Sequence, residues 1–176
     1  MRTLRLAFIA LLVFVSPALA TEPGADGWFH TGDAVRVKKI LFNFDVYAIS
    51  HEMKALPPAK SKQAVIDADV EKRFVWKMLR DVPHDKIQEA LSEAFKANHY
   101  DDQAKIKQAL AAFSGELKKG ARTEIHYLPE AKTVTITVQG GGTATVSGID
   151  FMKGMWSVWF GVIDQAKLGD SLIKDL

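Results

Sequence analysis

Alternation of bulky apolar and polar side chains predicts two strands in the first half of the chain. One lies within residues 28–53 and the other within residues 73–79, because every second side chain there is large and apolar. On the first strand, the face expected to meet the core carries Phe42, Phe44, Val46 and Ala48, and the mixed face carries Asn43, Asp45 and Tyr47. The second strand is expected to turn Phe74, Trp76 and Met78 inward.

The apolar period becomes helical after residue 82, which predicts two consecutive helices. Pro83 suits the first turn of the first helix, and Asp101 or Asp102 can cap the second. The two apolar stripes are Ile87, Leu91, Ala94 and Phe95, then Ile106, Leu110, Phe113 and Leu117. Gly115 or Gly120 is expected to end the second helix.

Three more strands and a closing helix complete the predicted elements. The strands cover residues 122–128, 132–139 and 143–147, and the helix over 151–160 is apolar nearly all round, so we expect it to be buried on most sides. Short helices are expected over 63–68 and 169–176. Because strands and helices occur in groups instead of alternating, the order predicts an α+β fold with an antiparallel sheet.

The first twenty residues have the composition of a secretory signal peptide. Two arginines precede an apolar run of about ten residues, far fewer than the roughly 20 that a membrane span requires, and Ala18-Leu19-Ala20 resembles a cleavage site. We therefore predict removal of residues 1–20, a mature chain of residues 21–176 forming one domain, and a periplasmic or secreted location with no membrane anchor after cleavage.

The net charge and the residue composition argue against nucleic-acid binding and against a metal site. Without Arg2 and Arg5 of the leader, the 23 basic side chains fall to 21 and balance the 21 acidic ones. No basic block is present, which argues against nucleic-acid binding. The chain has no cysteine, and its five histidines are too scattered to predict a metal site, so we expect no metal and no cofactor. Residues 140–142 are glycines between two strand-like runs, which favours a turn over a phosphate-binding loop.

Several short motifs resemble the chalcone isomerase-like family, over about residues 30–176. They are the strand start Ala34-Val35-Arg36-Val37-Lys38-Lys39, the following Val46-Tyr47-Ala48, the step Leu79-Arg80-Asp81-Val82, and the stretch from Asp150-Phe151 through Trp159-Phe160-Gly161. The resemblance is to the bacterial branch of that family. It implies an open-faced β-sandwich, with helices packed on one face of a long antiparallel sheet and a ligand cleft between them. Plant enzymes of the family cyclise chalcones to flavanones, and relatives with the same fold bind fatty acids.

The resemblance also implies where ligand contacts would lie. Its enzymes share an arginine, a threonine on the first long strand, a tyrosine and an asparagine on the following helix, and a threonine or serine before the last helix. Arg36 matches the arginine, while counting along the chain puts Tyr47, Asp85 and Met152 near three of the other positions. These departures argue against chalcone cyclisation. Trp156 and Trp159 are expected in the core, with the alternative that the edge of one of them lines the cleft, and Trp156 is kept as a candidate ligand contact on that alternative.

Three functions follow as hypotheses. The first is binding of a small apolar ligand with an anionic head, a fatty acid or a phenolic, which Arg36 would hold through its planar fork of donors. The second is an intramolecular lyase or isomerase acting on a chalcone-like enone, with Arg36 stabilising an oxyanion and Tyr47 donating a proton. The third is a partner-binding envelope protein without a small-molecule site. Arg36 is alternatively a structural ion pair with Asp33, Asp45 or another acid. The oligomeric state is left open.

Overall fold

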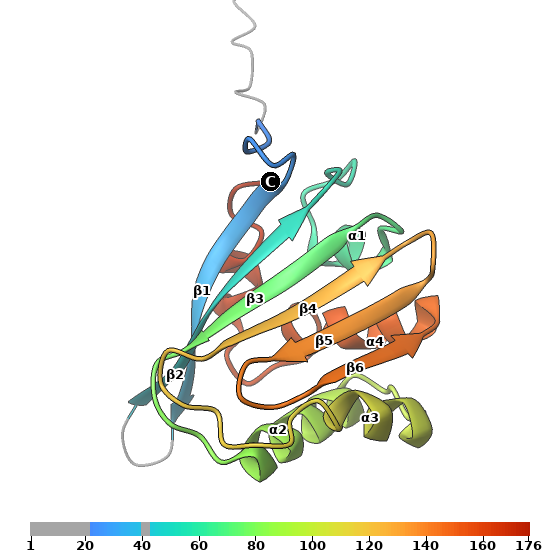
Figure 1. The fold of residues 1–176 in the computed structure, drawn as a ribbon. Coiled ribbons are helices and arrows are strands. Elements are labelled where there is room, and N and C mark those ends of the chain that lie inside the picture. The colour runs from blue at the N-terminus through green and yellow to red at the C-terminus, as the bar shows by residue number, and fades with distance from the viewer. Residues whose placement is uncertain (1–21, 40–42) are drawn as a thin grey trace, which may run out of the picture.

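The computed structural model describes residues 22–39 and 43–176, and within them six strands form one antiparallel sheet (Figure 1). The strands are β1 (Phe29–Lys39), β2 (Asn43–Met53), β3 (Lys72–Met78), β4 (Arg122–Leu128), β5 (Thr133–Val138) and β6 (Thr143–Ser147). Their order in the sheet is their order in the chain. The sheet is therefore a meander, with the helical segments inserted between strands or added after the last one.

The helices gather on one side of this sheet. They are α1 (Lys62–Asp67), α2 (His84–Ala97), α3 (Gln103–Leu110), α4 (Ile149–Phe160) and α5 (Lys167–Ser171). In Figure 1, α4 passes behind the strands, where it contacts β5, α1, α2 and α5, while α3 packs on β6 and α5 on β1. The predicted α+β fold, an antiparallel sheet with helices on one face, is confirmed.

The core lies between the sheet and α4. Eight of the twelve residues of α4 are buried, as its apolar surface on nearly all sides predicts. β3 turns Phe74, Trp76 and Met78 into the same core, also as predicted. Each of these large side chains contributes about 1.5–3 kcal/mol through removal of its apolar surface from water. Among the described residues no helix is long and apolar enough to cross a membrane.

Sequence alternation predicts one strand within residues 28–53, whereas the structure has two paired strands there, β1 and β2. The predicted core face of β2 is also wrong. The buried side chains of this strand are Tyr47, Ile49, His51 and Met53, whereas Phe44, Val46 and Ala48 are only partly buried. Phe42 lies outside the described residues. Both faces of β2 carry apolar groups, so alternation alone could not identify the face that meets the helices. Ile49 and Met53 share the face of Tyr47, and both are fully buried.

The second predicted helix is shorter than its apolar stripe. Asp102 caps α3 by accepting from the Lys105 N–H at 3.0 Å, but the helix ends at Leu110. Phe113 and Leu117 are fully buried beyond that end. Leu117 instead exchanges two backbone hydrogen bonds of 2.9 Å with Val82, because an extended segment there closes the loop back onto the end of β3.

The C-terminal segment packs so closely on β1 that one position needs glycine. The Asp175 N–H donates to the Thr31 carbonyl at 3.0 Å. Next to it, Gly32 has a φ of 154°, and a Cβ at that position would collide with the backbone of Ser171 and Leu172. This contact holds the chain after α4 against β1. The predicted signal peptide, residues 1–20, lies outside the described residues.

Candidate functional site

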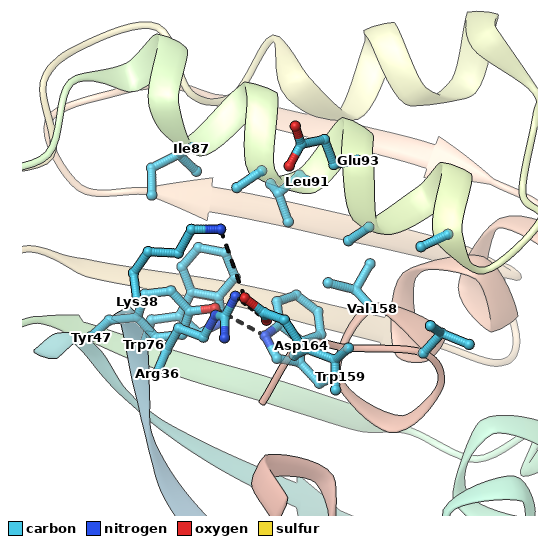
Figure 2. A pocket seen from close by; sticks show the side chains of 15 residues that line it. Arg36, Lys38, Tyr47, Trp76, Ile87, Leu91, Glu93, Val158, Trp159 and Asp164 are labelled. Atoms are coloured by element: carbon cyan, nitrogen blue, oxygen red, sulfur yellow. Dashed lines mark hydrogen bonds and ion pairs between the residues drawn. The ribbon is translucent and has the colours of Figure 1, made fainter. Parts of the chain in front are cut away.

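A cavity of about 260 Å³ opens between β1 and β2 on one side and α2 and the end of α4 on the other (Figure 2). Its wall is mostly apolar and includes Trp76, Ile87, Leu91, Val158, Trp159 and Ile163. Arg36, Lys38, Tyr47, Glu93 and Asp164 add polar groups. A second hollow of about 550 Å³ shares Arg36, Tyr47 and part of α2 with the first and extends toward Phe44 and Arg80. We call the two hollows together the cleft.

Strand pairing places the two main polar groups side by side. Arg36 of β1 lies directly opposite Tyr47 of β2, and residues opposite each other on neighbouring strands have side chains on the same face. A register irregularity follows at once, between Arg36 and Val37. The local β-sheet geometry therefore points both side chains at the helices, where Figure 2 shows them below α2.

The Arg36 guanidinium is held at the wall of the cleft. Its side chain is 15% exposed, and its Nη2 lies 2.6 Å from Oδ1 of Asp164. Its Nη1 donates to the side-chain oxygen of Gln165 and to the Val37 carbonyl, each at 3.3 Å. Lys38 places its Nζ 3.7 Å from the other Asp164 oxygen. The alternative that Arg36 forms an ion pair is therefore correct, but its partner is Asp164 and the guanidinium still lines the cleft.

Tyr47 presents a neutral phenol to the same cavity. Its ring stacks on Trp76 at 4.7 Å between centroids, and its hydroxyl accepts the Trp159 indole hydrogen at 3.1 Å. Burial raises the pKa of Tyr47, and the nearby Arg36 charge opposes part of that rise. The phenol keeps its proton at neutral pH, and since the hydroxyl already accepts from Trp159, that proton can be donated to a ligand.

The other three predicted contacts lie elsewhere. Asp85 is exposed in the first turn of α2, whose buried face is formed by Ile87 and later residues. Met152 and Trp156 are fully buried in α4, and the Trp156 indole donates to Nε2 of His51 at 2.9 Å. The structure does not bring these three residues to the cleft, and we drop them as candidate contacts.

Position along α4 explains why Trp159 rather than Trp156 reaches the cleft. The two residues are close to one turn apart, which is about 5 Å along the helix. Both rings contact Phe74, but Trp156 also contacts His51, whereas Trp159 also contacts Trp76 and donates its indole hydrogen to the Tyr47 hydroxyl. The alternative that an edge of Trp159 lines the cleft matches its place in the structure.

Sequence reasoning missed the acidic and amide partners of Arg36. Asp164 and Gln165 follow α4 and lie about 130 positions further along the chain than Arg36. No spacing or motif connects residues so distant. Within the described part of the chain, no group of three or more His, Asp or Glu side chains is arranged to hold a metal ion.

Comparison with known proteins now adds to the geometry. A family model described as chalcone isomerase-like matches residues 30–172, which include Arg36, Tyr47 and Asp164. The chain belongs to the chalcone isomerase-like family. Its fold is similar to that of a fatty-acid binding protein from Arabidopsis thaliana, with a TM-score of 0.68 and 14% sequence identity over 88% of this chain and 90% of that one. No curated protein matches the sequence. The resemblance to this family, noted from short motifs, is thereby confirmed, while the bacterial branch stays a prediction.

Proposed function

We propose that this chalcone isomerase-like protein is exported and binds a small apolar ligand with an anionic head, a fatty acid or a phenolic, in the cleft. One observation carries the proposal: the Arg36 guanidinium and the Tyr47 hydroxyl lie at the wall of the same apolar cavity. A guanidinium offers two parallel donors to a carboxylate, and a phenol adds a third hydrogen bond. The head group would sit at Arg36 and the apolar part among the aromatic and aliphatic side chains.

The anionic head and the apolar tail of such a ligand would contribute differently to the free energy of binding. A hydrogen bond to a charged group contributes about 1.5–3 kcal/mol, whereas each buried methylene contributes about 0.8 kcal/mol. Affinity would therefore come mainly from the tail, and selectivity for anions from Arg36. The smaller cavity alone is below the roughly 300–1,000 Å³ typical of ligand sites, but the adjoining hollow brings the cleft into that range.

Two further findings support the proposal. The Arabidopsis protein with the similar fold is named as a fatty-acid binding protein. The cavity itself favours a small-molecule ligand over a purely partner-binding envelope protein, in which side chains would fill the space between sheet and helices. Export rests on the first twenty residues. Isolation of the protein from the periplasm with Thr21 at its N-terminus would support export, and a full-length cytoplasmic chain would contradict it.

Ligand binding is tested by thermal shift and native mass spectrometry with saturated fatty acids of increasing length and a panel of phenolic acids. We expect affinity to rise with chain length until the cleft is filled, and Arg36→Met to weaken binding of acids by about tenfold or more, which corresponds to one lost charged hydrogen bond. Arg73→Met is a matched control, because Arg73 is a mostly buried arginine like Arg36, is ion-paired with Glu52 and does not line the cleft. Absence of any bound ligand, or equal affinity after Arg36→Met, would refute the proposal.

An intramolecular lyase or isomerase is the second candidate, because Arg36 and Tyr47 face one cavity. Arg36 would stabilise a developing oxyanion and Tyr47 would donate a proton. The raised pKa of Tyr47 makes its phenol a weak acid, which argues for slow proton transfer. Loss of enone absorbance with a chalcone panel tests this candidate: turnover that disappears in both Arg36→Met and Tyr47→Phe would support it, and absence of turnover would reject it.

A further inference from the structure

The anion-binding group of the cleft already has a carboxylate bound to it. Asp164 contacts Arg36 at 2.6 Å from the segment 161–166, which joins α4 to α5 and contributes Val162 and Ile163 to the same cavity. Figure 2 shows the Asp164 carboxylate beside the Arg36 guanidinium, with its second ion pair to Lys38 as a dashed line. A ligand carboxylate that reaches Arg36 must therefore take the place of this side chain or share the guanidinium with it.

The two partners of the Arg36–Asp164 ion pair differ in exposure to water, so Asp164 can move away more easily than Arg36. Asp164 is 55% exposed, whereas Arg36 is 15% exposed. The second Asp164 oxygen faces the Lys38 ammonium at 3.7 Å, and Lys38 is itself half exposed. Asp164 can move toward water and Lys38 without burying a charge, so its displacement costs little compared with displacement of a buried acid.

Other contacts keep Arg36 and the segment in place without Asp164. Gln165 receives the Val37 N–H at 2.9 Å and donates to the Val35 carbonyl at 2.8 Å, which ties the segment to β1. On the other side, Asn98 at the end of α2 accepts from the Val162 N–H at 2.7 Å and donates to its carbonyl at 3.1 Å. The segment is therefore anchored at both walls of the cleft, and the Asp164 side chain is free to exchange.

We propose that Asp164 is a built-in competitor for the anionic head group, which occupies Arg36 in the empty protein and is displaced toward Lys38 when an acid binds. This inference rests on the proposed ligand-binding function and deepens it. It explains how a guanidinium can line an apolar cavity without standing unpaired when no ligand is present. It also means that Asp164 lowers the affinity for acids but not for uncharged ligands of the same shape.

The test compares a long-chain fatty acid with the fatty alcohol of the same length, by isothermal titration calorimetry on the full mature chain. We expect Asp164→Asn and Asp164→Ala to bind the acid about fivefold more tightly than the wild type, the factor expected from removal of a partly exposed ion pair. Binding of the alcohol should not change. Asp170→Asn is the matched control, since Asp170 of α5 forms a similarly exposed ion pair with Lys62 of α1 and does not line the cleft.

Each result decides between distinct outcomes. A gain for the acid in both Asp164 variants, without a gain in Asp170→Asn or for the alcohol, supports the competitor role. Unchanged or weaker acid binding after substitution of Asp164 overturns it while leaving the ligand-binding function intact. An equal gain for acid and alcohol also overturns it, because the effect would then come from access to the cleft. If no form of the protein binds acid or alcohol, the proposed function itself fails.

Discussion

Acid should destabilise this protein through one histidine that lies outside the cleft. His51, on β2, is fully buried against Phe74 of β3 and against Trp156 and Phe160 of α4. Its Nε2 accepts the Trp156 indole hydrogen at 2.9 Å, and because an indole N–H can only donate, the ring proton must be on Nδ1. Nδ1 lies 2.7 Å from the Thr31 hydroxyl, which in turn donates to the Leu172 carbonyl at 2.8 Å. In this chain of hydrogen bonds Nδ1 donates to the Thr31 hydroxyl and Nε2 accepts from Trp156, so a second ring proton on Nε2 would break the bond to the indole.

The size of this loss of stability follows from the difference between the pKa of His51 in the folded state and its pKa in the unfolded state. Burial, and then the nearby Lys72 charge, hold the folded-state pKa of His51 well below its ordinary value. In the unfolded chain the pKa returns to about 6.5, so below that pH the unfolded state binds a proton that the folded state does not. The stabilisation is complete above pH 6.5 and falls as the pH is lowered. If His51 stays unprotonated in the folded state, the free energy of unfolding falls by about 1.6 kcal/mol between pH 6.5 and 5.

Urea unfolding followed by tryptophan fluorescence between pH 7.5 and 5 measures this loss. His51→Gln is expected to lower stability at every pH, because Trp156 and Thr31 lose their partner, but to remove the extra slope below pH 6.5. His84→Gln, at an exposed histidine at the start of α2, should retain the wild-type slope. Burial lowers the pKa of Lys72 to about 7, so Lys72 adds a slope of its own between pH 7.5 and 6.5. Below pH 6.5 Lys72 is largely protonated in both states, and the slope that belongs to His51 is measured in that range. Equal slopes in His51→Gln and the wild type would refute the reasoning.

Three further predictions concern packing and exposed backbone. Lys72→Met should cost about 2 kcal/mol in urea unfolding, because the buried ammonium donates to three carbonyls at the end of α1, and an unchanged midpoint would contradict this. Phe74→Ala should cost about 3–5 kcal/mol by the same assay, since its ring is fully buried against α4, and a loss below about 1 kcal/mol would show that the core collapses around it. Gln165→Ala should promote concentration-dependent self-association in sedimentation velocity, because the Gln165 amide bonds to backbone groups on the outer edge of β1. Gln88→Ala, on α2, serves as the control. A Gln165→Ala protein that stays monomeric at every concentration would refute this prediction.

Local patterning predicted most of the elements. Alternation located β3 to β6, the helical period located α2 and α4, and a capping aspartate located the start of α3. These signals are readable because they arise between residues a few positions apart. The end of α3 was not readable in this way, since the bridge between Val82 and Leu117 joins segments 35 residues apart and competes with continuation of the helix. The same limit led to the wrong core face for β2.

The sequence likewise predicted some residues of the candidate site and missed others. The motif around Arg36 indicated the family and hence the arginine, and counting along the chain put Tyr47 near the position of the family's threonine. Only the pairing of β1 with β2 places Tyr47 opposite Arg36. Counting failed for Asp85 and Met152, because helix rotation and depth in the core decide which side chain of a helix meets a cavity. Export, the signal peptide and the nature of the ligand stay predictions.

By itself, the sequence determined the type and order of most elements, the α+β class, the family and Arg36 as a candidate contact, but it did not separate β1 from β2. Only the tertiary structure decided which face of β2 is buried, where the cleft lies and what Arg36 binds in it. The physical reason is distance along the chain: periodicity, caps and turns act over a few residues, whereas Asp164 meets Arg36 only after the whole sheet has formed and α4 has packed across it.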